Sequence, residues 1–434
     1  MNLSIDSVAQ KLESELGAAA IEIEPNLLPA YAVDGIKPAL FCTPDTVEQC
    51  SAAVRVCADA AAAVTPWGGG TAMRIGNLPR RVEVVLGTAR LNRIIEHDHA
   101  NLTATVQSGI TLSALQETLA EQHQFVPFDP PQAARATVGG ITAANLNGPR
   151  RAFYGSIRDL VIGMKVALVS GEIIKAGGKV VKNVAGYDMC KLFVGSLGTL
   201  GIITELTVRL LPVPQRSAIF TAVGTLSQIF QFAEDLARLP LCPASVLILN
   251  TAAAERAGFP ANGALSAVRF EGFEETVLRQ LGDTQAMAKR SELTGELLSA
   301  DVEKQLWEFV SDFPLSPDRL VFRLTVPLSK LAEVITYAGE QADGDSSACM
   351  IADAESGSLW LSLAPADVNA KQFTTLLSLA QTCGGHALIF TAPPHLKTSD
   401  VWGMPPPTLT LMRGIKQQFD PKGLLNPGRF IGGL

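Results

Sequence analysis

Residues 66–71 read Pro-Trp-Gly-Gly-Gly-Thr, and no other stretch narrows the fold as much. Residues 64–66, which lead into the glycines, predict a short strand. Three consecutive glycines allow positive φ and let the backbone approach a ligand without Cβ clashes. Their exposed N–H groups can form a concave site for a pyrophosphate, although this stretch alone is also compatible with an ordinary glycine turn. It is neither a P-loop, which needs a following Lys and Ser/Thr, nor a Rossmann fingerprint, which opens a helix.

Two further segments are equally rich in small residues. Residues 136–145 read ATVGGITAAN, which leaves room for a large flat group against the main chain; a tight helix-packing contact is the alternative. Residues 182–188 read KNVAGYD and lead to 195–204, GSLGTLGIIT. Each glycine of this last run would cost about 1 kcal/mol in a plain helix. Close approach of the backbone to a ligand explains these glycines better.

The composition limits the classes of protein to which this chain can belong. The chain has 434 residues, of which 47% are hydrophobic and 18% charged, so it predicts a folded protein of about three folding units. With 35 basic and 42 acidic residues the formal charge is −7, which gives no bulk attraction for nucleic acid or an anionic membrane. The sequence shows neither the apolar core of a signal peptide nor an apolar run of 18 residues. We therefore expect a cytoplasmic protein that reaches the inner membrane, if at all, through partners.

The metal-binding residue types are dispersed. Seven cysteines form no CxxC pair, so the sequence does not predict a zinc ribbon or an iron–sulfur cluster held by this chain. The five histidines do not cluster either, and no metal site is expected. His97 and His99 fall in a polar stretch that is interpreted as a turn between strands, and His386 opens a predicted strand and is interpreted as structural.

The order of elements predicts an α+β chain in four parts. Residues 39–214 alternate strand and helix signals, with Thr43 as the expected N-cap of the first helix, and residues 1–38 are expected to pack on them. Residues 215–414 form the expected cap domain. Within it, residues 320–391 follow a strand–helix–strand–strand–helix–strand order typical of a ferredoxin-like unit, and residues 219–249 before them fit part of another such set. Residues 415–434 leave this rhythm and are expected to return to the first domain. Three basic side chains near this end are interpreted as helix-end and surface groups: Arg413, Lys416 and Arg429.

The three glycine-rich segments and the ending FDPKGLLNPGRF (419–430), in this order and spacing, resemble the FAD-binding domain of the vanillyl-alcohol-oxidase, or PCMH-type, flavoproteins. Within that superfamily they are most similar to the FAD-binding E subunits of bacterial glycolate oxidases. The resemblance covers about 39–214 and the last fifteen residues. It implies an FAD-binding domain of two α/β subdomains followed by the ferredoxin-like cap domain.

The resemblance also implies a set of FAD-binding residues. The glycine loop would hold the pyrophosphate, the second segment would line the flavin and ribityl chain, the third would pack beside the isoalloxazine, and the C-terminal motif would close the site. These residues are Pro66, Trp67, Gly68, Gly69, Gly70, Thr71, Ala72, Met73, Thr137, Gly139, Gly140, Ala143, Asn145, Gly198, Gly201, Ile202, Ile203 and Asn426. The first loop contains no histidine or cysteine that could tether a flavin, so we expect non-covalent FAD.

The implied activity is oxidation of a 2-hydroxy acid, such as glycolate or D-lactate, to the 2-oxo acid. Such a reaction needs a base for the hydroxyl proton, and the sequence identifies none. We therefore expect an FAD-dependent oxidoreductase subunit that works with a catalytic FAD subunit and an iron–sulfur subunit. Two alternatives remain open: a self-sufficient enzyme using His386, Tyr154 or Tyr187, and a non-catalytic flavin-binding assembly subunit.

Overall fold

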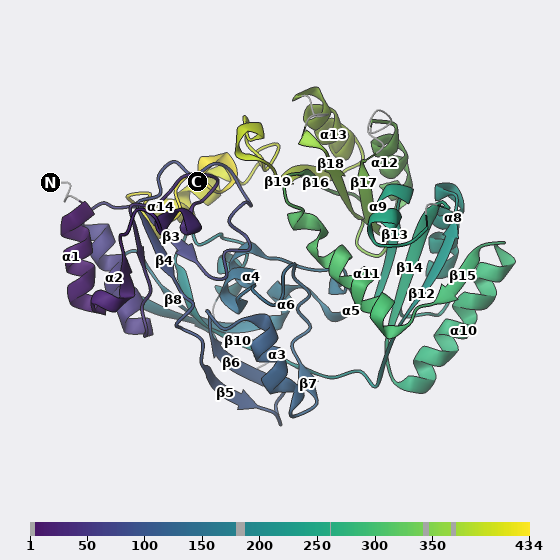
Figure 1. Cartoon of the computed structure of the whole chain (residues 1–434), viewed down its shortest axis with the longest axis horizontal. Coiled ribbons are helices and arrows are strands. Elements are labelled where there is room, and N and C mark those ends of the chain that lie inside the picture. Colours follow the sequence, from purple (N-terminus) through teal and green to yellow (C-terminus); the bar gives the residue numbers. More distant parts are fainter. Residues whose placement is uncertain (1–4, 179–186, 261, 342–346, 366–369) are drawn as a thin grey trace. The chain divides into compact units, whose positions relative to one another are not determined.

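A computed structural model of the chain describes residues 5–178, 187–260, 262–341, 347–365 and 370–434 (Figure 1). The chain forms two compact units. Unit 1 comprises Met1–Asn147, Ser156–Pro212 and Lys397–Leu434, and unit 2 comprises Gly148–Gly155 and Val213–Leu396. The chain passes from unit 1 to unit 2 between Pro212 and Val213, close to the expected boundary at residue 214. The chain re-enters unit 1 upstream of the segment 415–434.

The first sheet of unit 1 has the order β1-β2-β4-β3, in which β2, β4 and β3 run parallel. Its strands are β1 (Ile21–Glu22), β2 (Leu40–Cys42), β3 (Val64–Trp67) and β4 (Val84–Gly87). The helices α1 (Ile5–Leu16) and α2 (Val47–Asp59) pack on each other and share one apolar core with this sheet. Buried Cys50 and Cys57 are part of that core, where burial raises the pKa of each thiol to about 12. These two cysteines act as apolar packing groups.

Helix α2 begins three residues later than the sequence suggested. The hydroxyl of Thr46 accepts the N–H of Gln49 at 3.1 Å, so the prediction of a cap at Thr43 was wrong. The backbone N–H of Thr43 instead donates to the carbonyl of Ala20 at 2.9 Å. Gln49 completes the cap, because its side chain accepts the N–H of Asp45 at 2.8 Å. Two threonines precede the helix, and the second of them, Thr46, is the N-cap.

The second sheet of unit 1 is antiparallel, with the order β5-β6-β10-β8-β9. Its strands are β5 (Ile94–Asp98), β6 (Thr103–Gln107), β8 (Val161–Ala167), β9 (Ile173–Gly177) and β10 (Ile202–Arg209), and a separate pair is formed by β7 (Gln124–Phe125) and β11 (Leu211–Pro212). Strands β8 and β9 form an antiparallel hairpin. The helices of this part are α3 (Leu112–Ala120), α4 (Val138–Ala144), α6 (Ile157–Leu160) and α7 (Cys190–Phe193). Helix α4 packs on β10.

Unit 2 is built on one eight-stranded sheet of order β15-β12-β14-β13-β17-β18-β16-β19. Its strands are β12 (Arg216–Gly224), β13 (Ser245–Leu249), β14 (Ala264–Gly272), β15 (Thr294–Leu297), β16 (Leu320–Thr325), β17 (Cys349–Asp353), β18 (Ser358–Leu363) and β19 (His386–Thr391). Its helices are α5 (Arg151–Tyr154), α8 (Leu226–Ala237), α9 (Thr251–Arg256), α10 (Glu274–Arg290), α11 (Ala300–Asp312), α12 (Leu328–Gln341) and α13 (Ala370–Thr382).

This sheet consists of two ferredoxin-like repeats. The strand order 4-1-3-2 of β15-β12-β14-β13 is mirrored by 2-3-1-4 in β17-β18-β16-β19, and the repeats join through the antiparallel pair β13–β17. Joining the two sheets pairs one edge strand of each repeat. Helices α9 and α11 share an apolar core with one face of the joined sheet.

The C-terminal part of unit 1 contains α14 (Leu409–Phe419). Short 3₁₀ turns complete the structure: η1 (Ala18–Ala20), η2 (Leu28–Tyr31), η3 (Phe313–Leu315), η5 (Pro394–Leu396) and η6 (Ile431–Gly433). In the described part of the chain, no helix has the length and apolar character needed to cross a membrane.

Candidate functional site

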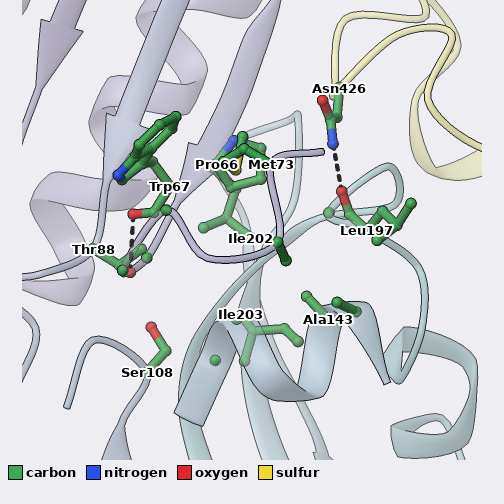
Figure 2. A pocket seen from close by; sticks show the side chains of 18 of the residues that line it. Pro66, Trp67, Met73, Thr88, Ser108, Ala143, Leu197, Ile202, Ile203 and Asn426 are labelled. Atoms are coloured by element: carbon green, nitrogen blue, oxygen red, sulfur yellow. Dashed lines mark hydrogen bonds between the residues drawn. The ribbon is translucent and has the colours of Figure 1, made fainter. Parts of the chain in front are cut away.

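Unit 1 contains a cavity with about 730 Å³ of empty space, at the carboxyl ends of the parallel strands β3 and β4 (Figure 2). The second sheet contributes the opposite wall through the start of β10, and helix α4 contributes its inner side. The lining residues are Pro66, Trp67, Gly68, Gly69, Gly70, Thr71, Ala72, Met73, Thr88, Ser108, Gly139, Gly140, Ala143, Ala144, Leu197, Gly198, Gly201, Ile202, Ile203, Asn426 and Arg429. The wall is therefore mostly backbone and small side chains.

The structure brings all the sequence-predicted site residues together around this cavity except Thr137 and Asn145. Thr137 is the N-cap of α4 and accepts the N–H of Gly140 at 3.2 Å. Asn145 ends α4 in the left-handed region, with φ of 50°, and accepts a hydrogen bond from Asn147. Both residues shape the wall of the cavity from behind. The predicted stretch 182–186 lies outside the described residues.

A neighbouring loop leaves no room for a side chain at Gly69. A Cβ added there would lie 1.8 Å from the carbonyl oxygen of Arg135, whose side chain in turn donates to the carbonyl of Gly69 at 3.3 Å. Of the three consecutive glycines only Gly70 has positive φ, at 73°. The backbone of the glycine loop therefore packs directly against the backbone of the residues before α4. The sequence interpretation attributed the need for glycine at position 69 to a ligand, whereas the neighbouring loop accounts for it.

Gly140 is different, because the space beside it opens into the cavity. A Cβ there would meet only the hydroxyl of Thr137 within 4 Å, at 3.1 Å. Ala143, one helical turn further on, also lines the cavity (Figure 2). This side of α4 thus leaves room for a ligand.

The third segment forms the wall opposite the glycine loop. Gly198 has φ of 70°, and a Cβ there would lie 2.3 Å from Cγ of Pro66, so the two loops touch. The carbonyl of Leu197 accepts the side-chain N–H of Asn426 at 2.7 Å (Figure 2). Asn426 also donates its backbone N–H to Val64 at 2.8 Å. The C-terminal motif therefore joins the strand before the glycine loop to the opposite wall.

Two uncharged side chains of the cavity wall, Ser108 and Asn426, carry a buried polar atom that has no partner in the described part of the chain. These atoms are Ser108 Oγ and Asn426 Oδ1, and both side chains are buried. A buried polar atom without a partner costs roughly 1–3 kcal/mol. Such atoms in a cavity wall indicate polar groups of a ligand or water.

A buried ionic cluster holds the chain just after the glycine loop. The guanidinium of Arg429 donates to the carbonyls of Met73, Ile75 and Asn77, the last at 3.0 Å. The ammonium of Lys397 donates to the two carbonyls between them, Arg74 at 2.7 Å and Gly76 at 2.9 Å. Five consecutive carbonyl oxygens are thus bound by two cations from the C-terminal part.

One carboxylate balances these two cations. Asp34 Oδ2 pairs with Lys397 at 2.8 Å and with Arg429, and all three side chains are almost fully buried. Burial lowers the pKa of Lys397 to about 8, and the charge of Arg429 adds to this effect against the attraction of Asp34. The three groups leave one surplus positive charge, and Arg429 lines the cavity. This surplus favours an anionic ligand.

The sequence interpretation missed several lining residues and misassigned two cations. Thr88, Ser108, Ala144, Leu197 and Arg429 line the cavity without having been predicted. The positions of Thr88 and Ser108, each just after a strand, were the available signal. Lys416 does lie in the last turn of α14, as the helix-end interpretation expects, but neither Lys416 nor Arg429 is a surface group, since both are buried.

The histidines show no metal site. His97 lies within β5 and its Nε2 bonds to Gln124 at 2.9 Å, so its assignment to a turn was wrong. The described residues contain no cluster of three or more His, Cys, Asp or Glu side chains arranged to bind a metal.

Comparison with known families identifies two regions of unit 1. Residues 38–177 match the FAD binding domain family, and residues 403–430 match the C-terminal domain family of FAD linked oxidases. The first match covers the glycine loop and α4. The second covers α14 and the motif that carries Asn426 and Arg429.

Several characterised proteins are similar along most of the chain. Glycolate oxidase subunit GlcE of Escherichia coli (strain K12) is 30% identical over 345 residues, which are 79% of this chain and 85% of that protein. Glycolate oxidase subunit GlcD of Bacillus subtilis (strain 168) is 28% identical over 424 residues, 91% and 89% of the two chains. D-lactate dehydrogenase of Anaerostipes hadrus is 26% identical over 429 residues, 91% and 89%.

Solved structures share the fold at lower identity. p-Cresol methylhydroxylase superposes with a TM-score of 0.76 at 18% identity, covering 98% of this chain and 96% of that one. Alkyldihydroxyacetonephosphate synthase gives 0.74 at 18% identity, covering 97% and 84%. These neighbours confirm the α+β fold predicted from the sequence.

The cavity residues fit an FAD. The open side of α4 at Gly140 admits a flat ring system, the unpartnered Ser108 Oγ and Asn426 Oδ1 can bond polar groups, and the surplus charge at Arg429 suits a pyrophosphate.

We predict that Gly140→Leu abolishes FAD binding while leaving the fold intact. Leucine is a good helix former, but its side chain would occupy the open side of the cavity. Titration of the apoprotein with FAD, followed by flavin fluorescence, should show affinity at least about 100-fold weaker, or roughly 2.7 kcal/mol. The matched control is Gly282→Leu on α10, where a Cβ meets nothing within 4 Å. Equal FAD affinity in both variants would refute the placement of the cofactor beside α4.

We predict that the contribution of Lys397 to stability grows with pH. Its pKa falls from the ordinary 10.5 in the unfolded chain to about 8 in the fold. Between these values the unfolded state binds more protons, so the free energy of unfolding should rise with pH. Urea denaturation of wild type and Lys397→Met from pH 7.5 to 10.5 should show their difference moving in favour of the wild type, by at most about 3 kcal/mol. A constant difference would mean that Lys397 is not desolvated.

Proposed function

This chain belongs to the FAD-linked oxidoreductases of the vanillyl-alcohol-oxidase superfamily, which carry a PCMH-type FAD-binding domain, and on that premise we propose that it is the FAD-binding subunit of a glycolate-oxidase-like complex. The complex would oxidise a 2-hydroxy acid, such as glycolate or D-lactate, to the 2-oxo acid. The observation that carries this proposal is similarity to two different glycolate oxidase subunits, combined with a cavity that fits FAD.

In the proposed reaction the cavity positions the flavin. When bound, FAD accepts a hydride from the carbon that carries the hydroxyl group. The glycine loop 66–71 would bind the pyrophosphate, with the charge of Arg429 behind it. Gly140, Ala143 and the loop from Leu197 would enclose the rings. Asn426 Oδ1 would accept a hydrogen bond from a polar group of the cofactor, and the hydroxyl of Ser108 would accept or donate one. We propose that unit 2, the predicted cap region 215–414, holds the substrate.

The hydroxyl proton must pass to a base, and the structure narrows the choice. Tyr154 donates to the carboxylate of Glu271 at 2.5 Å, and burial together with that carboxylate raises its pKa, so it is a poor proton acceptor. Tyr187 is 93% exposed. Desolvation and then the charge of Arg323 lower the pKa of His386, so its imidazole is neutral at pH 7. His386 is the most suitable of the three in the self-sufficient alternative.

We propose partner subunits because electrons must leave the flavin. Single-electron transfer commonly uses iron–sulfur clusters held by grouped cysteines, whereas the seven cysteines of this chain form no CxxC pair. An iron–sulfur subunit and a catalytic FAD subunit would then complete the assembly. We place the complex in the cytoplasm, with membrane contact only through its partners.

We predict that FAD is bound without a covalent link. No histidine or cysteine is among the residues that line the cavity. Acid precipitation of the purified protein should release the yellow colour into the supernatant. Colour retained in the washed pellet would contradict this prediction and would point to a tethering residue elsewhere.

We predict that the isolated chain binds FAD but is reduced slowly by glycolate or D-lactate. Anaerobic stopped-flow mixing should show flavin bleaching well below about 1 s⁻¹, the lower range of enzyme turnover. Co-expression with the catalytic and iron–sulfur subunits should raise the rate by orders of magnitude. Fast bleaching of the lone chain would favour the self-sufficient enzyme, with His386→Ala as the next variant. No bleaching even in the complex would favour the assembly role.

A further inference from the structure

Unit 1 contains a second cavity, with about 580 Å³ of empty space, which shares the loop 195–201 with the FAD cavity. Leu197 and Gly198 line the FAD cavity. The residues on either side of them, Ser196 and Thr199, line the second cavity. Both middle residues have positive φ, 52° for Leu197 and 70° for Gly198, and adjacent residues of the loop face different cavities. One loop therefore forms part of the wall of both.

The wall of this second cavity is largely apolar. Helix α14 contributes Met412 and Ile415, and the segment after it contributes Phe430. The chain at α7 contributes Leu192 and Val194. A thioether and a phenyl ring both make favourable contacts with aromatic groups. The wall therefore favours an apolar ligand, and a flat ring in particular.

The buried cation of this wall, Lys416, has no donor left for a ligand. Its ammonium group donates to two backbone carbonyls and to the carboxylate of Asp420, the last at 2.6 Å. A lysine has three N–H donors, so all of them are used, and Asp420 balances the charge. Lys191, the other lysine that lines the cavity, is partly exposed and pairs with Asp188 at 3.0 Å. Because both cations are paired, the wall favours a neutral ligand over an anion.

One hydroxyl in the wall is unsatisfied. Ser196 is only 5% exposed, and its Oγ has no hydrogen-bond partner among the residues that the structure describes. The hydroxyl of Thr199 differs, because it donates to the carbonyl of Ser196 at 2.8 Å. A buried hydroxyl without a partner is unfavourable. A ligand that places one oxygen beside Ser196 would remove this cost.

We propose that this cavity is a second ligand site of unit 1, which binds a small neutral aromatic molecule that carries one hydrogen-bonding oxygen, such as a carbonyl. The ring would pack against Met412 and Phe430, and the oxygen would accept a hydrogen bond from the hydroxyl of Ser196. Because the loop 195–201 also lines the FAD cavity, a ligand here should alter the environment of a bound flavin without occupying its site.

The test uses the FAD-loaded protein and two neutral probes of nearly the same shape. Acetophenone carries a carbonyl group, whereas ethylbenzene has a methylene group in its place. Dissociation constants of both probes are measured by ligand-detected NMR for the wild type and for Ser196→Ala. Comparing the ratio of the two affinities between the proteins cancels the difference in hydrophobicity between the probes. We expect the preference for acetophenone over ethylbenzene to fall at least about threefold in Ser196→Ala, because that variant cannot donate the hydrogen bond.

The same variant tests whether the hydroxyl of Ser196 is needed for the fold. Removing a buried hydroxyl that has no partner should not lower the melting temperature of the ligand-free protein. A lower melting temperature together with an unchanged preference between the probes would show that Ser196 is structural and would overturn the inference.

A second variant removes the space for the ring. Met412→Trp places a larger side chain on the cavity face of α14. The matched control is Leu411→Trp, since Leu411 is not among the residues that line the cavity and is 64% exposed. We expect both probes to bind at least about tenfold more weakly to Met412→Trp and within about twofold of wild type to Leu411→Trp. If Met412→Trp does not fold, Ile415→Phe narrows the same space, with the same expected direction.

The flavin reports whether probe and cofactor occupy separate sites. Saturating acetophenone should shift the flavin absorption spectrum of the wild type while FAD remains bound, and it should leave the spectrum of Met412→Trp unchanged. A wild-type spectrum that does not respond to bound acetophenone would refute the coupling through the loop. Release of FAD by acetophenone, or probe affinities that neither Ser196→Ala nor Met412→Trp changes, would overturn the inference, because the probes would then bind elsewhere. None of these outcomes depends on reduction by a 2-hydroxy acid, so a failure of this inference is distinguishable from a failure of the proposed function.

Discussion

The binding of five consecutive carbonyl oxygens by Arg429 and Lys397 is the constraint on which the FAD cavity depends. Carbonyls 73–77 alternate between the two cations, and Asp34 pairs with both. Carbonyl dipoles directed into one buried space repel one another unless donors fill it. Because the donors come from the last 38 residues of unit 1, the C-terminal segment shapes the loop that follows the three glycines.

The opposite wall is fixed in a similar way. Lys416 on α14 is buried and donates to the carbonyls of Thr199, at 2.7 Å, and Leu425, at 3.0 Å, while pairing with Asp420 at 2.6 Å. Asp420 in turn accepts the N–H groups of the residues before Asn426. Both loops that face the cofactor are thus held by cations of the C-terminal part, which explains why a short terminal motif accompanies the much larger FAD-binding region.

The sequence predicted the small-residue walls well, because Gly140, Ala143 and their neighbours form contiguous motifs. The sequence interpretation failed for residues whose role depends on partners that are distant in the sequence or not evident from it. The burial of Arg429 follows from carbonyls more than 350 positions away, and Thr46 rather than Thr43 is the N-cap of α2, where Gln49 completes the cap. Gly69 was assigned to a ligand, whereas the loop at Arg135 requires it. Single polar residues after strands, such as Ser108, carried too little local signal.

The buried cluster beside the proposed FAD site of unit 1 carries more positive than negative charge. The chain has 42 acidic and only 35 basic residues, so a lack of acids does not explain why two buried cations share Asp34. In unit 2, Glu271 is likewise shared by two arginines, Arg269 and Arg150. An unsatisfied buried cation lowers stability unless something binds it. An anionic ligand, such as a pyrophosphate in unit 1, would supply the missing charge and would then stabilise the unit that binds it.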